Sequence, residues 1–164
     1  MKELMRRLRF AGWILLTSLV PVAVAADWDE IAWFDDASGY AEAMVEAEKS
    51  GTPVLVYFYT DWCPYCRQLN QQILTAGEVQ AELGQMLAVR VNAERGPKER
   101  SLALQRRVRG YPALFIWDPG PGGGFLPIRR TVSNGTRVRL KTPEEFVATL
   151  RSAGRRQLER HSSP

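Results

Sequence analysis

The chain has 164 residues, which is enough for one domain with its own hydrophobic core. Its formal net charge of +4 comes from the two ends: residues 1–26 contribute +3, residues 27–150 contribute −2 and residues 151–164 contribute +3. Because a nucleic-acid-binding domain gathers its basic residues on the folded body, this distribution argues against a nucleic-acid partner.

The first 26 residues have the layout of a secretory signal peptide. Four basic residues lie among the first nine, an apolar run follows over residues 10–20, and small residues lead up to Ala25 and Ala26. We therefore predict export to the periplasm, with cleavage after one of these two alanines. The alternative is an uncleaved inner-membrane anchor, since residues 10–26 carry no charge and reach the lower limit for a membrane span.

The next segment predicts a helix, a buried strand and a second helix. Apolar residues recur at helical spacing over residues 36–49, at Ala37, Tyr40, Met44 and Ala47, and Gly51 ends this helix. The apolar, β-branched and aromatic run over 53–59 predicts a buried strand. Pro64 then opens a helix that extends to Leu74, and a short helical turn is expected over 78–83.

The second half of the chain alternates in the same way. Strands are predicted over 86–92, 113–117 and 125–132, with a helix over 97–108 between the first two and a loop rich in Gly and Pro over 118–124. Pro127 favours an edge strand, and residues 133–136 form a turn around Asn134-Gly135. A last helix begins after Thr142 and ends near Ala153, followed by a basic tail over 154–164 that we expect to be flexible. Strands joined by crossover helices predict a partly parallel sheet covered on both faces.

The two cysteines, Cys63 and Cys66, stand where the strand over 53–59 gives way to the following helix. A thiol at a helix N-terminus lies near unpaired backbone N–H groups, which stabilise the reactive thiolate. A disulfide that closes so short a loop removes little chain entropy, so it would be a poor structural staple. Reversible thiol–disulfide chemistry is therefore the favoured role. Zinc binding and a Cys–His nucleophile are disfavoured because His161 is the only histidine, and we expect no metal or cofactor beyond the Cys63–Cys66 disulfide.

Two motifs carry a family resemblance: Trp62-Cys63-Pro64-Tyr65-Cys66 after a buried strand, and Gly110-Tyr111-Pro112 before the strand over 113–117. With the order of elements over residues 36–153, they resemble the thioredoxin superfamily, in particular its exported members. The resemblance implies an α/β, thioredoxin-like three-layer fold over 27–153, with a central mixed β-sheet flanked by helices. It also implies a cis peptide bond before Pro112.

In this resemblance Cys63 is the exposed nucleophile and Cys66 the resolving thiol. The implied substrate site comprises five flanking residues: Trp62, Pro64, Tyr65, Tyr111 and Pro112. Packing alone is the alternative role for Trp62 and Tyr65.

The sequence also departs from the family pattern. Tyr57 occupies the place of a buried Asp that assists proton transfer at the resolving thiol, and Arg90 stands where a Lys is common. Glu30, Asp61 or a water molecule are the candidates to supply this assistance. The Cys-Pro-Tyr-Cys motif resembles that of glutaredoxins. Gly-Tyr-Pro replaces their Thr-Val-Pro, however, which argues against glutathione binding.

These observations predict a monomeric thiol–disulfide oxidoreductase of the cell envelope, a protein-disulfide oxidoreductase that acts on protein thiols or disulfides and exchanges electrons with a membrane redox partner. The sequence leaves open whether it works as a reductase or as an oxidase, because the superfamily spans potentials from about −270 to about −120 mV. The alternative is a non-catalytic thioredoxin-fold binding module or holdase.

Overall fold

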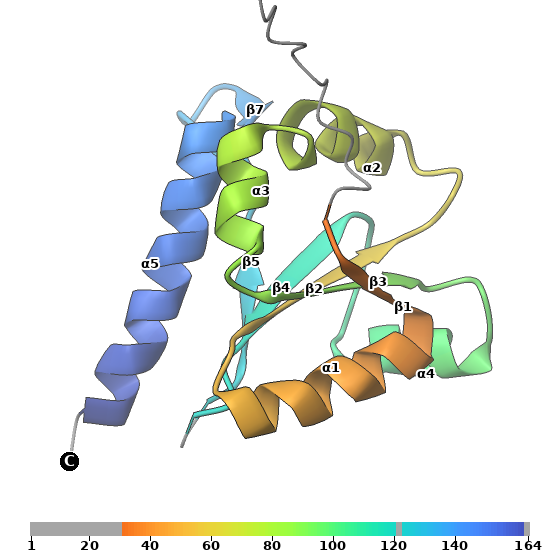
Figure 1. The fold of residues 1–164 in the computed structure, drawn as a ribbon. Helices are drawn as coiled ribbons and strands as arrows, with labels where there is room; N and C mark the ends of the chain where they lie inside the picture. Colours follow the sequence, from red (N-terminus) through yellow and green to blue (C-terminus); the bar gives the residue numbers. More distant parts are fainter. Residues whose placement is uncertain (1–30, 121–122, 163–164) are drawn as a thin grey trace, which may run out of the picture.

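The computed structural model describes residues 31–120 and 123–162 (Figure 1). The predicted signal peptide, its cleavage site and Glu30 lie outside these residues. The centre of the fold is a five-stranded mixed sheet in the order β1-β3-β2-β4-β5. Its strands are β1 (Trp33–Asp35), β2 (Val54–Tyr59), β3 (Leu87–Asn92), β4 (Ala113–Trp117) and β5 (Phe125–Ile128). The strands β1, β3 and β2 are parallel, whereas β4 runs antiparallel to both β2 and β5.

Helices cover both faces of this sheet, which confirms the predicted three layers (Figure 1). One face carries α1 (Asp36–Ser50) and α4 (Pro97–Gln105). The other carries α2 (Pro64–Leu69), its π-helical continuation η2 (Asn70–Leu74), α3 (Gly77–Leu83) and α5 (Pro143–Ser162). In the central strand β2, the side chains of Leu55 and Tyr57 pack on the face covered by α2, α3 and α5. Those of Val54, Val56 and Phe58 pack on the face covered by α1 and α4. Because both of its faces are buried, β2 reads as a continuous apolar run in the sequence.

The capping signals found in the sequence are present as predicted. Gly51 ends α1 with φ at 73°, in the left-handed region where glycine carries no steric penalty. At the start of α5, the Glu145 N–H donates to Thr142 Oγ1 at 3.3 Å and the Thr142 N–H donates to the Glu145 carboxylate at 2.9 Å. These reciprocal bonds form the capping box that the sequence predicted.

The predicted strand over 125–132 is wrong as a single element. The chain leaves the sheet after Ile128, and β6 (Thr131–Ser133) pairs instead with β7 (Val138–Leu140) in a separate two-stranded hairpin. The turn of this hairpin contains Gly135 at φ 92°, as the Asn-Gly pair predicted. Pro127 lies in the edge strand β5, also as predicted, where its missing N–H leaves no central ladder bond unmade.

The structure also differs from the prediction at β1, α4 and α5. The three-residue strand β1 was not predicted, because it is too short to show a pattern. The helix α4 ends at Gln105 rather than Val108, since Arg107 takes up a left-handed backbone conformation with φ at 53°. The helix α5 continues past Ala153 to Ser162, over Arg, Gln, Leu and Glu residues that favour helix. It therefore extends into the basic segment 154–164, whose flexibility stays a prediction.

We expect Gly39→Ala to destabilise the protein although alanine favours helix. A Cβ at this position of α1 would lie 2.6 Å from the backbone carbonyl carbon of Phe34, which a rotamer change cannot relieve. Overpacking of this kind costs about 1–3 kcal/mol, against a helix-propensity gain of about 1 kcal/mol, so a net loss of up to about 2 kcal/mol is expected. Urea unfolding measures it.

Gly154→Ala is the matched control for this substitution. Gly154 lies in α5, and apart from its neighbours in the helix backbone nothing lies within 4 Å of the added Cβ, so the same change should raise the free energy of unfolding by up to about 1 kcal/mol. Stabilisation of both alanine variants would contradict the close approach of Gly39 in α1 to the Phe34 backbone in β1.

Candidate active site

The cysteine pair lies at the carboxyl end of the central strand β2, at the start of α2. Cys63 is the N-cap residue of this helix and Pro64 its first residue, so the predicted position at a strand–helix junction is confirmed. The two cysteines form a disulfide with their Cα atoms 5.2 Å apart. The Cys66 N–H donates a hydrogen bond to Cys63 Sγ at 3.1 Å. After reduction the same donor would stabilise a thiolate on Cys63.

The prediction of an exposed Cys63 is wrong for this disulfide-bonded form. Both cysteines are only 2% exposed and belong to the core cluster that includes Tyr57 and Leu69. The exposed residues of the motif are instead Trp62 at 62%, Pro64, and Tyr65 at 58%. Because a disulfide joins both sulfurs across one turn of α2, Cys63 is held inward with Cys66.

Pro112 lies at the same end of the sheet as the cysteine pair. The peptide bond between Tyr111 and Pro112 is cis, which confirms the prediction from the family resemblance. The next residue, Ala113, is the register partner of Phe58 near the carboxyl end of β2. Tyr111 is half-buried and packs against the cluster that contains the disulfide. The structure thus brings the two motifs together, whereas the roles of Tyr111, Pro112 and Pro64 in substrate binding stay predictions.

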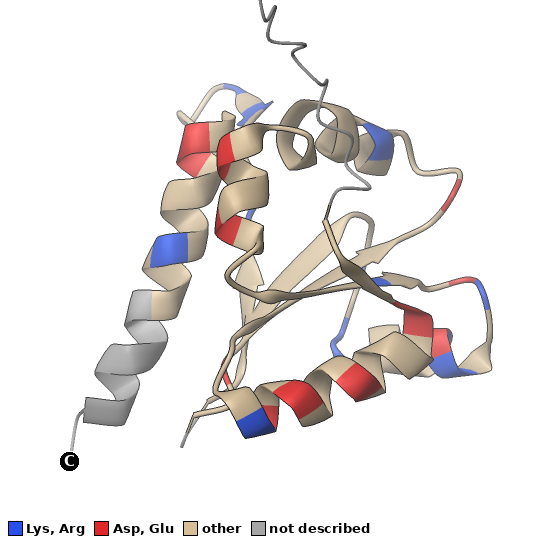
Figure 2. Ribbon diagram, in the orientation of Figure 1, with Lys and Arg blue, Asp and Glu red and all other residues tan. Residues whose placement is uncertain are grey.

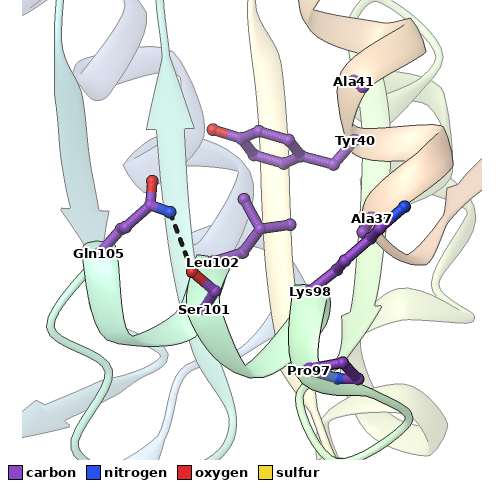
Figure 3. Close-up of a pocket in the computed structure, with 8 residues that line it drawn as sticks. All are labelled: Ala37, Tyr40, Ala41, Pro97, Lys98, Ser101, Leu102 and Gln105. Carbon is purple, nitrogen blue, oxygen red and sulfur yellow. Dashed lines mark hydrogen bonds between the residues drawn. The ribbon is translucent and has the colours of Figure 1, made fainter.

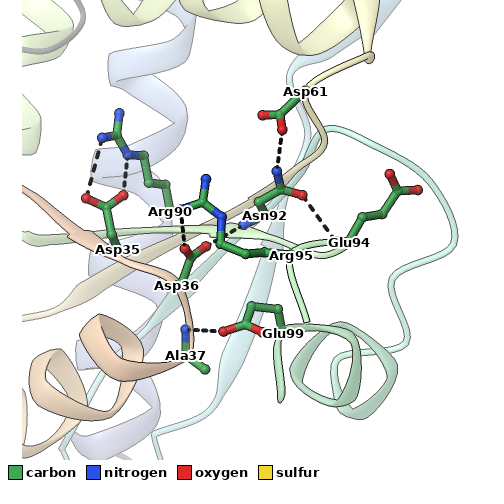
Figure 4. A network of polar contacts seen from close by, with 9 residues as sticks. All are labelled: Asp35, Asp36, Ala37, Asp61, Arg90, Asn92, Glu94, Arg95 and Glu99. Carbon is green, nitrogen blue, oxygen red and sulfur yellow. Dashed lines mark hydrogen bonds and ion pairs between the residues drawn. The ribbon is translucent and has the colours of Figure 1, made fainter. Parts of the chain in front are cut away.

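The loop before Cys63 is tied to the end of β3 by a polar network (Figure 4). Asn92, only 4% exposed, donates from Nδ2 to the Asp61 carboxylate at 2.9 Å and accepts from the Glu94 N–H at 3.1 Å. The Glu94 carboxylate accepts a hydrogen bond from Trp62 Nε1 at 2.8 Å. The Asn92 N–H donates to Asp36 at the start of α1 at 3.0 Å. These contacts fix the position of Trp62 relative to the disulfide.

Sequence reasoning missed Asn92 and Glu94. A usable signal was present: Asn92 is the last residue of a strand predicted to run parallel to β2, and Glu94 follows it closely, whereas the carboxyl ends of parallel strands meet at one edge of a sheet. The sequence alone did not show that these two strands are neighbours.

Tyr57 does not replace the buried Asp of the family as a proton acceptor. Its side chain is 1% exposed, and its hydroxyl donates to Asn70 Oδ1 at 3.1 Å. Burial raises the pKa of Tyr57 well above its usual value, so the phenol stays neutral. Asn70 lies one helical turn beyond Cys66, where α2 becomes η2, so the contact links the central strand to the cysteine-bearing helix.

Asp61, Arg90 and Glu82 each have a partner of their own. Arg90, the register partner of Tyr57, pairs with Asp35 at 2.5 Å, and its guanidinium lies 5.8 Å from the Trp33 ring centre. Asp61 is exposed and accepts the hydrogen bond from Asn92 described above. In the described residues the one buried charged side chain is Glu82, which pairs with Arg151 at 2.8 Å on the far side of α3 from the cysteines.

Two other features bear on the range of ligands. Within residues 31–120 and 123–162, no three His, Cys, Asp or Glu side chains come together as a metal site.

A surface groove of about 520 Å³ lies between α1 and α4, lined by residues such as Tyr40, Leu102 and Gln105 (Figure 3). These helices cover the sheet face opposite the disulfide, so this groove is separate from the cysteine pair.

The described part of the chain also bears on membrane attachment. None of its helices has both the length and the apolar composition needed to cross a bilayer. The apolar run over 10–20, on which the predicted signal peptide or anchor depends, lies outside that part.

Comparison with known proteins places this arrangement in a family. A family model described as thioredoxin-like matches residues 33–119. The chain is 37% identical over 79 residues to the thiol:disulfide interchange protein DsbD 1 of Pseudomonas aeruginosa, covering 48% of this chain and 13% of that protein. It is 29% identical over 113 residues to DsbD of Ralstonia nicotianae, covering 68% of this chain and 17% of that one. The chain therefore spans only a small part of these relatives.

Solved structures agree on the fold. A thioredoxin from Thermus thermophilus superposes with a TM-score of 0.56 at 25% identity, covering 79% of this chain and 87% of that one. The reduced C-terminal domain of DsbD from Neisseria meningitidis superposes with a TM-score of 0.58 at 18% identity, covering 74% of this chain and 98% of that domain. The second likeness concerns the fold alone. With the family model matching more than half of its residues and the Trp62–Cys66 motif at the expected strand–helix junction, the chain belongs to the thioredoxin-like family.

Proposed function

We propose that this chain is a protein-disulfide oxidoreductase that exchanges electrons with partner proteins through Cys63 and Cys66. The observation that carries the proposal is the disulfide itself, formed by the only two cysteines at the N-terminus of α2. Its short loop makes it a weak staple, while the helix terminus and the Cys66 N–H favour a reactive sulfur at Cys63. The names of the Pseudomonas and Ralstonia relatives, thiol:disulfide interchange proteins, support the same activity.

In the reducing direction the reaction has two exchange steps. The Cys63 thiolate attacks one sulfur of a partner disulfide, forming a mixed disulfide and releasing the second partner sulfur as a thiolate. Cys66 then loses its proton and attacks Cys63 Sγ, which forms the Cys63–Cys66 disulfide and releases the first partner sulfur. The departing thiolate takes up the proton that Cys66 loses. Two electrons pass to the partner, and the reverse sequence oxidises a partner dithiol.

We further propose that the protein works as a monomer in the cell envelope, exported to the periplasm by residues 1–26. The basic start, apolar run and small residues of this segment support export. In an oxidising compartment a reductant must be recharged, and an oxidant must pass its electrons on, so a membrane redox partner fits either direction. An uncleaved N-terminal segment would anchor the protein beside such a partner. Mass spectrometry of the protein recovered from the envelope distinguishes the two forms by the mass of the leader.

The reduction potential of the Cys63–Cys66 pair tests the proposal. We expect equilibration in glutathione buffers to give a single two-electron transition between about −270 and −120 mV, together with turnover of insulin disulfides. A reduction potential of about −270 mV would identify the protein as a reductant, and one of about −120 mV would identify it as a disulfide donor. A variant with both cysteines replaced by serine is the blank. If the pair never forms an intramolecular disulfide in solution, the redox function fails and the binding module replaces it.

A further inference from the structure

A second surface groove borders the candidate active site on the side of Tyr65. It has a volume of about 550 Å³ and runs between α2, which contributes Tyr65 and Gln68, and the β6–β7 hairpin, which contributes Val138 and Arg139. Arg130, which precedes β6, also lines it. We call it the Tyr65 groove. Because Tyr65 stands between the two cysteines in the sequence, the groove borders the cysteine motif.

The hairpin side of the Tyr65 groove is strongly basic. Residues 125–142 contain five basic residues and no acidic one: Arg129, Arg130, Arg137, Arg139 and Lys141. Figure 2 shows Lys or Arg positions in the β6–β7 hairpin at the top of the view. The position of these charges depends on the exit of the chain from the sheet after Ile128. A single long strand over 125–132 would not have placed the hairpin beside α2.

The two arginines of the groove differ in how their charge is balanced. Arg139 binds the Glu145 carboxylate through two hydrogen bonds of 2.7 Å. These bonds, together with the one from the Thr142 N–H, lower the pKa of Glu145 to about 2. The charge of Arg139 is therefore largely neutralised within the protein. Arg130 has no carboxylate partner in the described part of the chain. Its guanidinium lies 5.2 Å from the centre of the Tyr65 ring, so its position is set by the active-site motif.

The groove also offers apolar surface. Val138 is 71% exposed and Tyr65 58% exposed, and both side chains line it. On the other side of the cysteine pair, by Trp62, the exposed carboxylates of Asp61 and Glu94 lie near a basic residue, because the Arg67 guanidinium donates to the Asp61 carbonyl at 3.4 Å. The candidate active site is thus basic on its Tyr65 side, whereas charges of both signs lie on its Trp62 side. A bound segment with carboxylates would be attracted to the Tyr65 side.

We propose that the Tyr65 groove binds an acidic segment of the partner protein, adjacent to the cysteine that exchanges with Cys63. A carboxylate of this segment pairs with Arg130, and an apolar neighbour packs on Tyr65 and Val138. The inference rests on the proposed function and adds to it the chemical class of the segment that is recognised.

Exchange kinetics with three model peptides test this inference. The peptides differ only in the residues that flank one cysteine, which are Glu, Gln or Lys, and each carries 5-thio-2-nitrobenzoate as a mixed disulfide that releases a coloured thiolate. With the reduced full-length protein at low ionic strength, the Glu peptide should react fastest and the Lys peptide slowest. Raising the salt concentration should reduce the difference, because the charges are exposed to solvent.

The variant Arg130→Gln and its matched control Arg129→Gln test whether Arg130 causes the preference for the Glu peptide. We expect Arg130→Gln to lower the ratio of the Glu-peptide rate to the Gln-peptide rate by about two- to fivefold, the range for an exposed ion pair. Arg129→Gln removes the same charge from the neighbouring residue, which does not line the groove, and should keep the wild-type ratio. An equal ratio in wild type, Arg129→Gln and Arg130→Gln would overturn the inference, as would the absence of any preference in the wild type.

A binding measurement separates this inference from the proposed function. The Glu peptide with serine in place of cysteine cannot exchange, and its affinity for the oxidised protein is measured by fluorescence anisotropy. If no peptide exchanges but this one binds wild type and Arg129→Gln more tightly than Arg130→Gln, the groove is confirmed and the redox function fails. If exchange proceeds without charge preference and binding is the same in all three proteins, the groove is wrong and the redox function stands. Neither exchange nor binding would reject both.

Discussion

A Cys63→Ser variant is expected to lose disulfide exchange down to the uncatalysed background, whereas Cys66→Ser should stop at a covalent adduct with its partner. The difference follows from their positions in α2. Cys63 is the N-cap residue, and its sulfur accepts the Cys66 N–H at 3.1 Å, so it is the sulfur whose thiolate the helix stabilises. Serine keeps the size of the side chain but is not a thiolate nucleophile. Cys66 is required only for the second step, in which it releases the partner.

Two measurements check this expectation. Insulin reduction should be absent in both variants, because neither completes the cycle. Mass spectrometry after mixing with one equivalent of a peptide disulfide should show a peptide adduct on Cys66→Ser, removed by dithiothreitol, and none on Cys63→Ser. Wild type should release free peptide and accumulate no adduct. An adduct on Cys63→Ser would contradict the assignment, because it would make Cys66 the attacking residue.

Phe146→Ala is expected to lower the free energy of unfolding by about 3–5 kcal/mol. Phe146 is completely buried in α5 and packs in the same cluster as Cys63, Cys66 and Leu69. Replacement by alanine removes most of the apolar side chain and leaves a cavity that the close-packed surroundings fill only in part. Because a domain of this size is stable by only about 5–15 kcal/mol, the loss is a large fraction of the total. Urea unfolding of the oxidised protein measures it.

Val45→Ala provides the control for this prediction. Val45 lies in α1 on the other face of the sheet and is 52% exposed, so its replacement should change the free energy of unfolding by no more than about 0.5 kcal/mol. A Phe146→Ala loss below about 1 kcal/mol would mean that α5 does not pack on the sheet as described. The two substitutions thus compare a buried and an exposed apolar side chain in helices on opposite layers.

The local features of this protein were predictable from its sequence. The buried strand β2 followed by the cysteine-bearing helix was fixed by an apolar run, the Cys-Pro-Tyr-Cys motif and a proline suited to the first helical turn. A helix end was marked by Gly51, a helix start by Thr142 and a turn by Asn134-Gly135, and the structure contains all three. These signals depend on neighbours within about four residues, so they act before any tertiary structure is known.

The features that shape the candidate site depended on contacts between distant segments. Asn92 reaches Asp61 across 31 residues, and Glu94 reaches Trp62 across 32, only because β3 lies beside β2 in the sheet. The low exposure of Cys63 likewise depends on the cluster formed by β2, α2 and α5.

The β6–β7 hairpin shows the same division most clearly. Residues 125–132 are compatible with a strand along their whole length, and nothing local in the sequence marks the exit after Ile128. In the tertiary structure the Lys141 backbone N–H donates to the Arg130 carbonyl at 2.9 Å, and the Arg139 guanidinium binds Glu145 at the start of α5. The sequence by itself determined the redox motif and the family of the fold, because short motifs and the order of locally predicted elements are enough to recognise them. Only the tertiary structure decided which charges border the cysteine pair, because that depends on where the hairpin packs against α2 and α5.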